Sequence, residues 1–197
     1  MIRRTLLAKA SLFGASVLLR GIAGMGNALA AETNRKPARP ASRYLPIPDG
    51  YVRTGQMEQV PPAVLYGVAL QESARMFGQY ALPYPWTLNV AGEPRRFRTH
   101  AEAVNGLRES VRRGITSVDC GLMQVNWRYH NKKLGDYHRA LDPYPNLRVG
   151  AQILRDHYAD TRDWFKAVGR YHSPGDAARA ESYARSVFHR ISMVAHA

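Results

Sequence analysis

The amino-acid sequence predicts an α+β fold that is mostly helical and contains one small β-hairpin. Apolar residues recur at helical spacing in several segments of the 197-residue chain. One short region, residues 87–98, alternates instead with the period of two that is typical of strands. Prolines and capping residues mark where helices begin. A chain of this length has room for one well-cored domain, and we expect no second globular unit.

The first fifty residues are expected to lie outside that domain. Residues 1–30 combine early arginines, a ten-residue apolar stretch between Lys9 and Arg20, and small residues before a cleavage point after Ala30. This pattern predicts a signal peptide, and it leaves both general and twin-arginine export open. Residues 31–50 are rich in proline and charge, which predicts a flexible linker. The folded domain is therefore expected over residues 51–197.

The elements in the first half of this domain are predicted from local signals. A helix should begin near Pro61-Pro62, because proline suits a first helical turn, and run through Glu72. Two alternating runs, 87–90 and 95–98, predict the β-hairpin. Thr99 and a glutamate three residues later form a capping box for the next helix, which should end at Gly114.

The second half is predicted to be helical after the segment TSVDCGLMQVNWRYH. Helical periodicity recurs at about residues 146–158, 164–171 and 177–191. No internal repeat is present in the sequence. The expected fold is a bundle of helices around one hairpin.

Charge and cysteine content restrict the partners and the source of stability. Removing residues 1–30 takes away four basic residues and no acidic one, so the formal charge falls from +13 to +9. Acidic envelope polymers or an anionic membrane surface are more plausible partners for an exported basic protein than nucleic acid, for which no motif is present. The same charge would also serve simple solubility. Cys120 is the only cysteine, so no internal disulfide can form and the core must supply stability.

Glu72 is the most informative position in the sequence. On a helix it shares a stripe with Leu65, Val68, Ala69 and Met76, which are all apolar. Burying a carboxylate without a partner costs several kcal/mol or forces the group to keep its proton. A chemical role for Glu72 is therefore expected.

Three segments in fixed order carry a resemblance to a known family. They are Gln71-Glu72-Ser73, the hexapeptide Gly-Leu-Met-Gln-Val-Asn at 121–126, and Ala-Val-Gly-Arg-Tyr-His-Ser at 167–173. Together they resemble the soluble lytic transglycosylases of the lysozyme-like superfamily, over about residues 50–192. The hairpin and the phrase Ser-Val-Asp-Cys at 117–120 resemble the specialised branch found beside secretion and conjugation machines.

The resemblance implies a lysozyme-like fold and cleavage of peptidoglycan glycan strands in the periplasm. Glu72 would protonate the MurNAc–GlcNAc β-1,4 bond and then, as a base, activate the C6 hydroxyl, so that 1,6-anhydro-MurNAc ends form without water. Tyr171 would donate a hydrogen bond to this carboxyl. No cofactor and no metal would be needed, and partners from a conjugation or secretion apparatus are implied. The residues implied to bind substrate are Ser73, Met123, Gln124, Asn126 and Tyr171.

Other functions remain open at this stage. A muramidase-type hydrolase would use Asp119 as a second carboxylate beside Glu72, although an aspartate in a turn-like segment more often bonds backbone amides. A non-catalytic wall-binding assembly factor is favoured by two departures from the family pattern. Cys120 replaces a serine thought to contact the glycan, and we expect it to be a small buried residue. His172 replaces an asparagine.

Overall fold

The computed structural model describes residues 46–194. The predicted signal peptide and residues 31–45 of the predicted linker lie outside the described residues. The helices are α1 (Asp49–Glu58), α2 (Pro62–Ser73), α3 (His100–Arg112), α4 (Trp127–Leu134), α5 (Tyr137–Leu141), α6 (Pro143–Thr161), α7 (Trp164–His172) and α8 (Ala177–Val194). The strands are β1 (Ala74–Phe77), β2 (Tyr80–Pro83), β3 (Thr87–Val90), β4 (Glu93–Arg96), β5 (Val118–Cys120) and β6 (Val125–Asn126).

The α+β, mostly helical fold class is confirmed. The helices predicted from proline and capping signals correspond to α2 and α3, those predicted from helical periodicity correspond to α6, α7 and α8, and the predicted hairpin is β3–β4. The sequence predicted one hairpin, but the structure contains two, because β1 and β2 form a second one. Strands β5 and β6 extend the first hairpin into a four-stranded sheet. Helices α1, α4 and α5 were also not predicted.

Helix α2 is the central element of the core. Residues 64–70 are all buried, so the helix is covered on every side and not along one stripe. Gly67 allows α8 to approach closely, since a Cβ there would lie 2.5 Å from Cγ1 of Ile191. Met76 was predicted to share the apolar face with Glu72. It lies instead in β1 and is 54% exposed, because the helix ends at Ser73.

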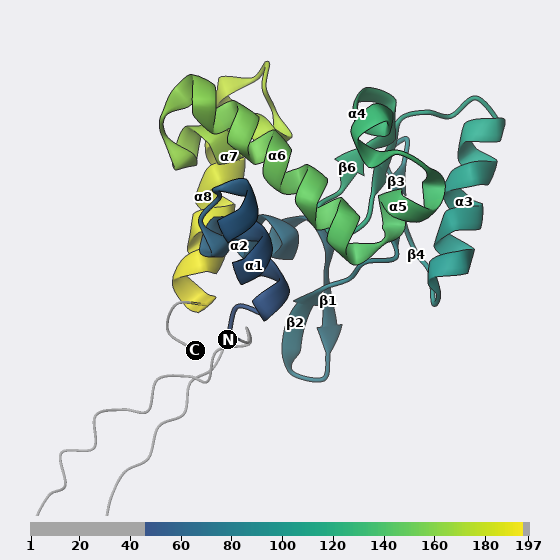
Figure 1. The fold of residues 1–197 in the computed structure, drawn as a ribbon, viewed down its shortest axis with the longest axis horizontal. Helices are drawn as coiled ribbons and strands as arrows, with labels where there is room; N and C mark the ends of the chain where they lie inside the picture. Colours follow the sequence, from purple (N-terminus) through teal and green to yellow (C-terminus); the bar gives the residue numbers. More distant parts are fainter. Residues whose placement is uncertain (1–45, 195–197) are drawn as a thin grey trace, which may run out of the picture. The chain divides into compact units, whose positions relative to one another are not determined.

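Helix α6 connects two groups of elements (Figure 1). On one side it packs against α1 and α7, and on the other it contacts α4, α5 and β6. It starts at Pro143, and the side chain of Asp142 caps it by accepting a hydrogen bond from the Tyr144 amide at 3.1 Å. The helical group and the sheet are therefore both anchored to one long, well-capped helix.

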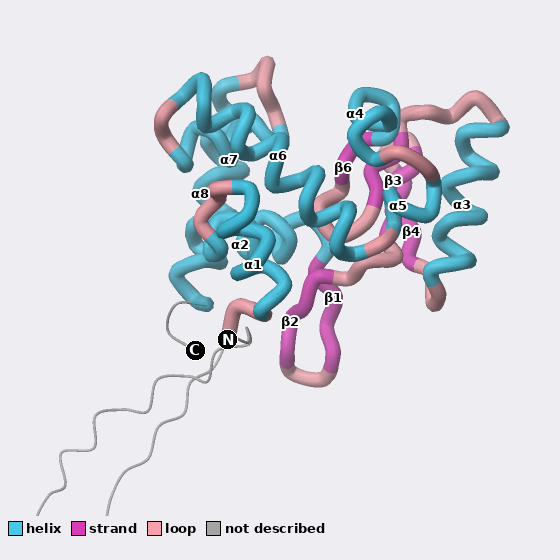
Figure 2. The backbone as a smooth tube through the Cα atoms, in the orientation of Figure 1, coloured by secondary structure: helices cyan, strands magenta, loops and turns pink. Residues whose placement is uncertain are grey.

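The four-stranded sheet has the order β4-β3-β5-β6, and all its pairs are antiparallel. Figure 2 shows its strands β3, β4 and β6 as magenta segments of the backbone. Ala91 and Gly92 both have positive φ angles, which a tight two-residue hairpin turn requires. In the register of the sheet, Asn89 pairs with Asp119, and Asp119 pairs with Asn126. Directly paired residues share a face, so a polar row crosses three strands.

Candidate active site

Glu72 lies in the last turn of α2, partly exposed, with its carboxyl held by one tyrosine. The hydroxyl of Tyr183 on α8 donates a hydrogen bond to Oε1 of Glu72 at 2.5 Å. Burial raises the pKa of Glu72 from 4.5 to about 7; the Tyr183 hydrogen bond opposes this rise, and the charge of Asp119 adds to it. A carboxyl with this pKa is present in both protonation states at neutral pH.

Tyr171 does not make the hydrogen bond predicted for it. Its hydroxyl donates to the backbone carbonyl of Met123 at 2.7 Å, while Tyr183 occupies the place beside the carboxyl. Tyr171 remains close enough for the charge of Glu72 to raise its pKa further, after burial. The role of orienting the carboxyl therefore falls to Tyr183, and Tyr171 holds the turn that follows β5.

Asp119 lies on strand β5, and the predicted bonding to nearby turn amides is wrong. Its Oδ1 accepts a hydrogen bond from Nδ2 of Asn126 at 2.7 Å, across the β5–β6 pair. Burial raises the pKa of Asp119, and this rise is opposed by the Asn126 bond and by the charge of His172. The structure thus brings a second carboxyl into the electrostatic surroundings of Glu72.

The Gly-Leu-Met-Gln turn at 121–124 is held rigidly in position. Gly121 has φ +76°, and a Cβ there would lie 2.6 Å from Nδ2 of Asn146, so only glycine fits. Asn146 is fully buried on α6 and binds three backbone groups: the Met123 amide, the Cys120 carbonyl and the Ala140 carbonyl. This one side chain ties α6 to the end of β5, to the turn that follows it and to α5.

Two residues implied to bind substrate are buried instead. Ser73 is 1% exposed, and its hydroxyl donates a hydrogen bond to the carbonyl oxygen of Leu122 at 2.8 Å. This bond links the end of α2 to the turn. Met123 is fully buried, and its Cγ packs where a Cβ on Gly150 would fall. Neither side chain is available to contact a glycan directly. Both act as packing beneath the turn.

Gln124 and Asn126 remain partly exposed. Gln124 has a positive φ of 45° and donates from Nε2 to the carbonyl oxygens of Gly121 and Thr87, at 2.9 and 3.2 Å. Asn126 caps α4 by accepting from the Arg128 amide at 3.1 Å while it also donates to Asp119. Each amide is therefore oriented by the protein and stays partly exposed, and that of Asn126 lies against the Asp119 carboxyl.

Cys120 is fully buried on β5, as expected for a small core residue. Burial raises the pKa of its thiol. Within residues 46–194 no group of three or more His, Cys, Asp or Glu side chains could hold a metal ion. Over the same residues, no helix combines the length and apolar character needed to cross a membrane.

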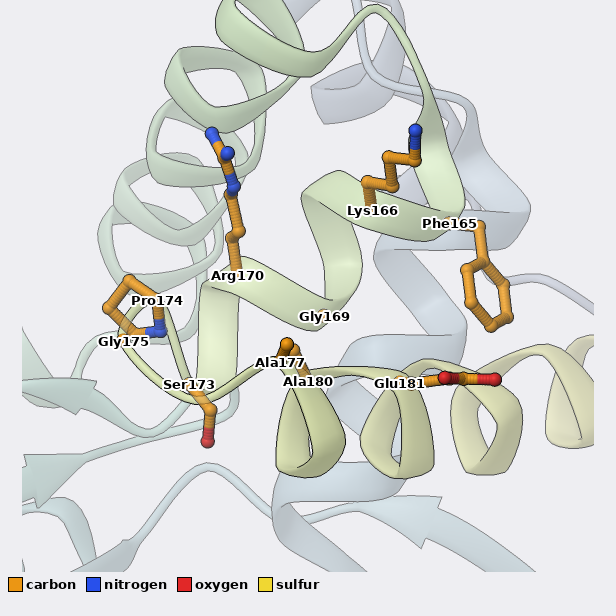
Figure 3. Close-up of a pocket in the computed structure, with 10 residues that line it drawn as sticks. All are labelled: Phe165, Lys166, Gly169, Arg170, Ser173, Pro174, Gly175, Ala177, Ala180 and Glu181. Atoms are coloured by element: carbon orange, nitrogen blue, oxygen red, sulfur yellow. The ribbon is translucent and has the colours of Figure 1, made fainter.

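A hollow of about 530 Å³ lies between α7, the following loop and α8 (Figure 3). Lys166 and Arg170 project from α7 beside it, and Glu181 lies on the α8 side. Glu72 and Tyr183 are not among the residues that line this hollow. It is therefore separate from the carboxyl site.

Tyr183 and Asn146 were missed by sequence reasoning, although both carried a signal. Tyr183 stands three residues after Ala180 and four before Val187, on the apolar stripe of α8. A phenol hydroxyl on a buried stripe requires a partner, by the same logic that singled out Glu72. Asn146 follows Asp142 by one turn and also faces the core. Its partners lie too far along the sequence to be inferred.

Comparison with protein families agrees with this geometry. The family model of the transglycosylase SLT domain matches residues 52–189, well over half of the chain. No significant match to a curated protein or to a solved structure was found. The matched range contains both carboxyls, both tyrosines and the 121–126 turn. The chain therefore belongs to the transglycosylase SLT domain family, with a lytic-transglycosylase type of action on peptidoglycan.

Proposed function

We propose that this protein is a lytic transglycosylase that cleaves the MurNAc–GlcNAc β-1,4 bond of peptidoglycan with Glu72 as its only acid and base. The observation that supports this most directly is the Glu72 carboxyl, whose pKa of about 7 suits donation and acceptance of a proton at neutral pH. The Tyr183 hydrogen bond fixes the direction of Oε1. Gln124 and Asn126 supply oriented amides for the sugar.

The proposed reaction consumes no water, because the C6 hydroxyl of MurNAc takes the place of the attacking water. Protonated Glu72 gives its proton to the glycosidic oxygen, the bond from that oxygen to C1 of MurNAc breaks, and positive charge develops on the ring. The resulting carboxylate then accepts the proton of the C6 hydroxyl, and O6 bonds to C1. The products are a GlcNAc end and a 1,6-anhydro-MurNAc end, with Glu72 protonated again.

A muramidase-type hydrolase is the second candidate, and Asp119 favours it. Asp119 lies close enough to Glu72 to raise its pKa, and the Asn126 bond holds its carboxylate in place. A hydrolase could use such a group as a nucleophile or base. The transglycosylase proposal is preferred because it needs only one carboxyl, and because burial raises the pKa of Asp119 and so disfavours the charged form that a nucleophile or base requires.

Digestion of purified sacculi in ¹⁸O-labelled water separates the two reactions. The transglycosylase releases muropeptides with unlabelled 1,6-anhydro ends, whereas a hydrolase releases reducing ends that carry one ¹⁸O. Mass analysis of the soluble products reads both. Reducing, labelled ends on the major products would assign the protein to the hydrolases, and no soluble product would indicate a wall-binding factor.

Asp119→Asn provides the matching variant. Under the transglycosylase proposal it removes a charge and not a catalyst, so turnover per folded molecule should stay within about threefold of the wild type. A nucleophile or base at this position would cost several orders of magnitude instead. The rate of muropeptide release, corrected for the folded fraction by circular dichroism, distinguishes these results.

We further propose that the protein acts in the periplasm and opens the wall locally beside a conjugation or secretion apparatus. Support comes from the signal-peptide pattern of residues 1–30 and from the phrase Ser-Val-Asp-Cys at 117–120. Fusion of residues 1–40 to a phosphatase that is active only after export tests the location. A fusion that stays inactive would contradict it.

A further inference from the structure

His172 lies against the tyrosine that holds the candidate catalytic carboxyl. It is the last residue of α7, it is exposed, and its imidazole stacks on the ring of Tyr183. The ring centroids are 4.5 Å apart and the planes differ by 3°. The stack joins α7 to α8 and covers one face of the Tyr183 ring, in a residue that is only 7% exposed.

The Tyr183 ring must be held accurately for its hydroxyl to act on Glu72. The hydrogen bond to Oε1 is short, at 2.5 Å, and a small rotation of the phenol would lengthen or misalign it. The rest of the ring is enclosed by the core, where Tyr183 packs among buried residues of α8. The parallel imidazole supplies the remaining wall, so it restricts rotation of the ring plane.

We propose that His172 is a positioning residue that acts on Glu72 through Tyr183. Its ring fixes the plane of the phenol, and the phenol in turn keeps its hydroxyl on the carboxyl. The structural part of this proposal concerns only these contacts. Its consequence for turnover rests on the proposed transglycosylase function.

The ring and the charge of His172 have separate effects. The titratable and charged groups around the stacked pair are Glu72 of α2, Asp119 of β5, Tyr171 of α7 and Arg190 of α8. The charge of His172 acts on Asp119 and lowers its pKa. The ring acts on Tyr183. His172→Phe keeps a stacking ring without the charge, and His172→Ala removes both.

The pKa of the Glu72 carboxyl is the most direct readout. Protein labelled with ¹³C at the glutamate carboxyl carbon is titrated by NMR, and the Glu72 signal is assigned by its loss in Glu72→Gln. Tyr183→Phe removes a bond that favours the charged form, so the Glu72 pKa should rise by roughly one unit. His172→Ala should raise it in the same direction, and His172→Phe should leave it near the wild-type value.

Coupling between the two positions identifies the route of the effect. In a Tyr183→Phe background, His172→Ala should cause no further rise, because the bond it protects is already absent. His189→Ala, which removes an exposed histidine on α8, is the matched control and should change nothing. In the wild-type background His172→Ala should lower kcat about three- to tenfold at unchanged KM, and His172→Phe should restore it.

Several results would overturn the proposal. An unchanged Glu72 pKa in a folded His172→Ala variant would show that the stack does not position Tyr183. A fall in that pKa would mean that the imidazole chiefly excludes water. If His172→Ala raised the Glu72 pKa as much in the Tyr183→Phe background as in the wild type, its effect would not act through Tyr183. Because the titration needs no turnover, failure of the transglycosylase function would leave this result readable.

Discussion

At the scale of single residues, the protonation of Glu72 depends on burial of its carboxyl and on its hydroxyl donor, Tyr183. The carboxyl is partly exposed, yet burial dominates its pKa and brings it to about 7. The last turn of a helix adds to this effect, because the negative end of the helix dipole disfavours a carboxylate. The Tyr183 hydrogen bond lowers this pKa, so removing the hydroxyl should raise the pKa of Glu72.

Tyr183→Phe and Tyr171→Phe form a matched pair of variants. Tyr183→Phe should raise the pKa of Glu72 and therefore move the alkaline limb of the kcat/KM profile to higher pH, since the free enzyme must hold its proton to react. Tyr171→Phe should leave that limb in place. It should lower the free energy of unfolding by about 1–3 kcal/mol, because the Met123 carbonyl loses its donor.

The pH profile of muropeptide release and urea unfolding measure these two effects separately. A shift of the alkaline limb in Tyr171→Phe, together with an unmoved limb in Tyr183→Phe, would restore the role first predicted for Tyr171. It would also remove the basis for assigning Tyr183 to the carboxyl.

Among single residues, Glu72 could be singled out from the sequence, whereas the tyrosine that binds its carboxyl could not. Glu72 was predicted because a carboxylate within an apolar helix needs a chemical reason. The stripe used for that inference was partly wrong, since Met76 is exposed in β1. Tyr183 is 111 positions away, and no local pattern joins the two. Resemblance pointed instead to Tyr171, which the fold places nearby on a different acceptor.

At the scale of elements, the 121–124 turn depends on helix α6. The buried side chain of Asn146 accepts from one backbone amide and donates to two backbone carbonyls around this turn. Ser73 adds a contact from the end of α2 to the Leu122 carbonyl. These contacts place the turn, and with it β5 and Asp119, relative to the helix that carries Glu72.

Asn146→Ala should therefore be strongly destabilising. Removing three hydrogen bonds of a fully buried side chain should lower the free energy of unfolding by about 3 kcal/mol or more. Asn105→Ala is the control, because Asn105 is exposed and bonds only the side chain of Arg108; it should cost less than about 0.5 kcal/mol. Urea unfolding compares the two. Equal, small losses would show that the turn does not depend on α6.

Elements with strong local signals were predicted, and those set by distant pairing were not. Thr99 caps α3 by accepting from the Glu102 amide, as the capping box indicated. Strand β5 has three residues and exists because β3 and β6 flank it. Asp119 was consequently assigned to a turn. Strands this short are stabilised by their neighbours and carry little pattern of their own.

For the whole molecule, the raised pKa of Glu72 is a cost to folding at neutral pH. The folded state holds the proton with a pKa of about 7, against 4.5 in its ordinary surroundings. The folded protein therefore binds more protons than the unfolded chain between these values. Stability from this group is complete below pH 4.5 and is lost as the pH rises through 7.

Glu72→Gln should remove that loss. The amide oxygen can still accept from Tyr183, so the variant should match the wild type at pH 4 and exceed its free energy of unfolding by about 1–3 kcal/mol at pH 8. Thermal or urea unfolding at both pH values measures the difference. An equal gain in the free energy of unfolding at pH 4 and at pH 8 would mean that burial of the Glu72 charge is not the cause of the gain.

Glu72 is proposed to be the only acid and base for cleavage of the glycan. The release of soluble muropeptides from purified sacculi by Glu72→Gln at pH 7, with folding verified in the same sample, tests this role. An amide can neither donate nor accept the required proton, so we expect a folded protein that releases no 1,6-anhydro products. Release at the wild-type rate would contradict the claim and place the chemistry on another residue.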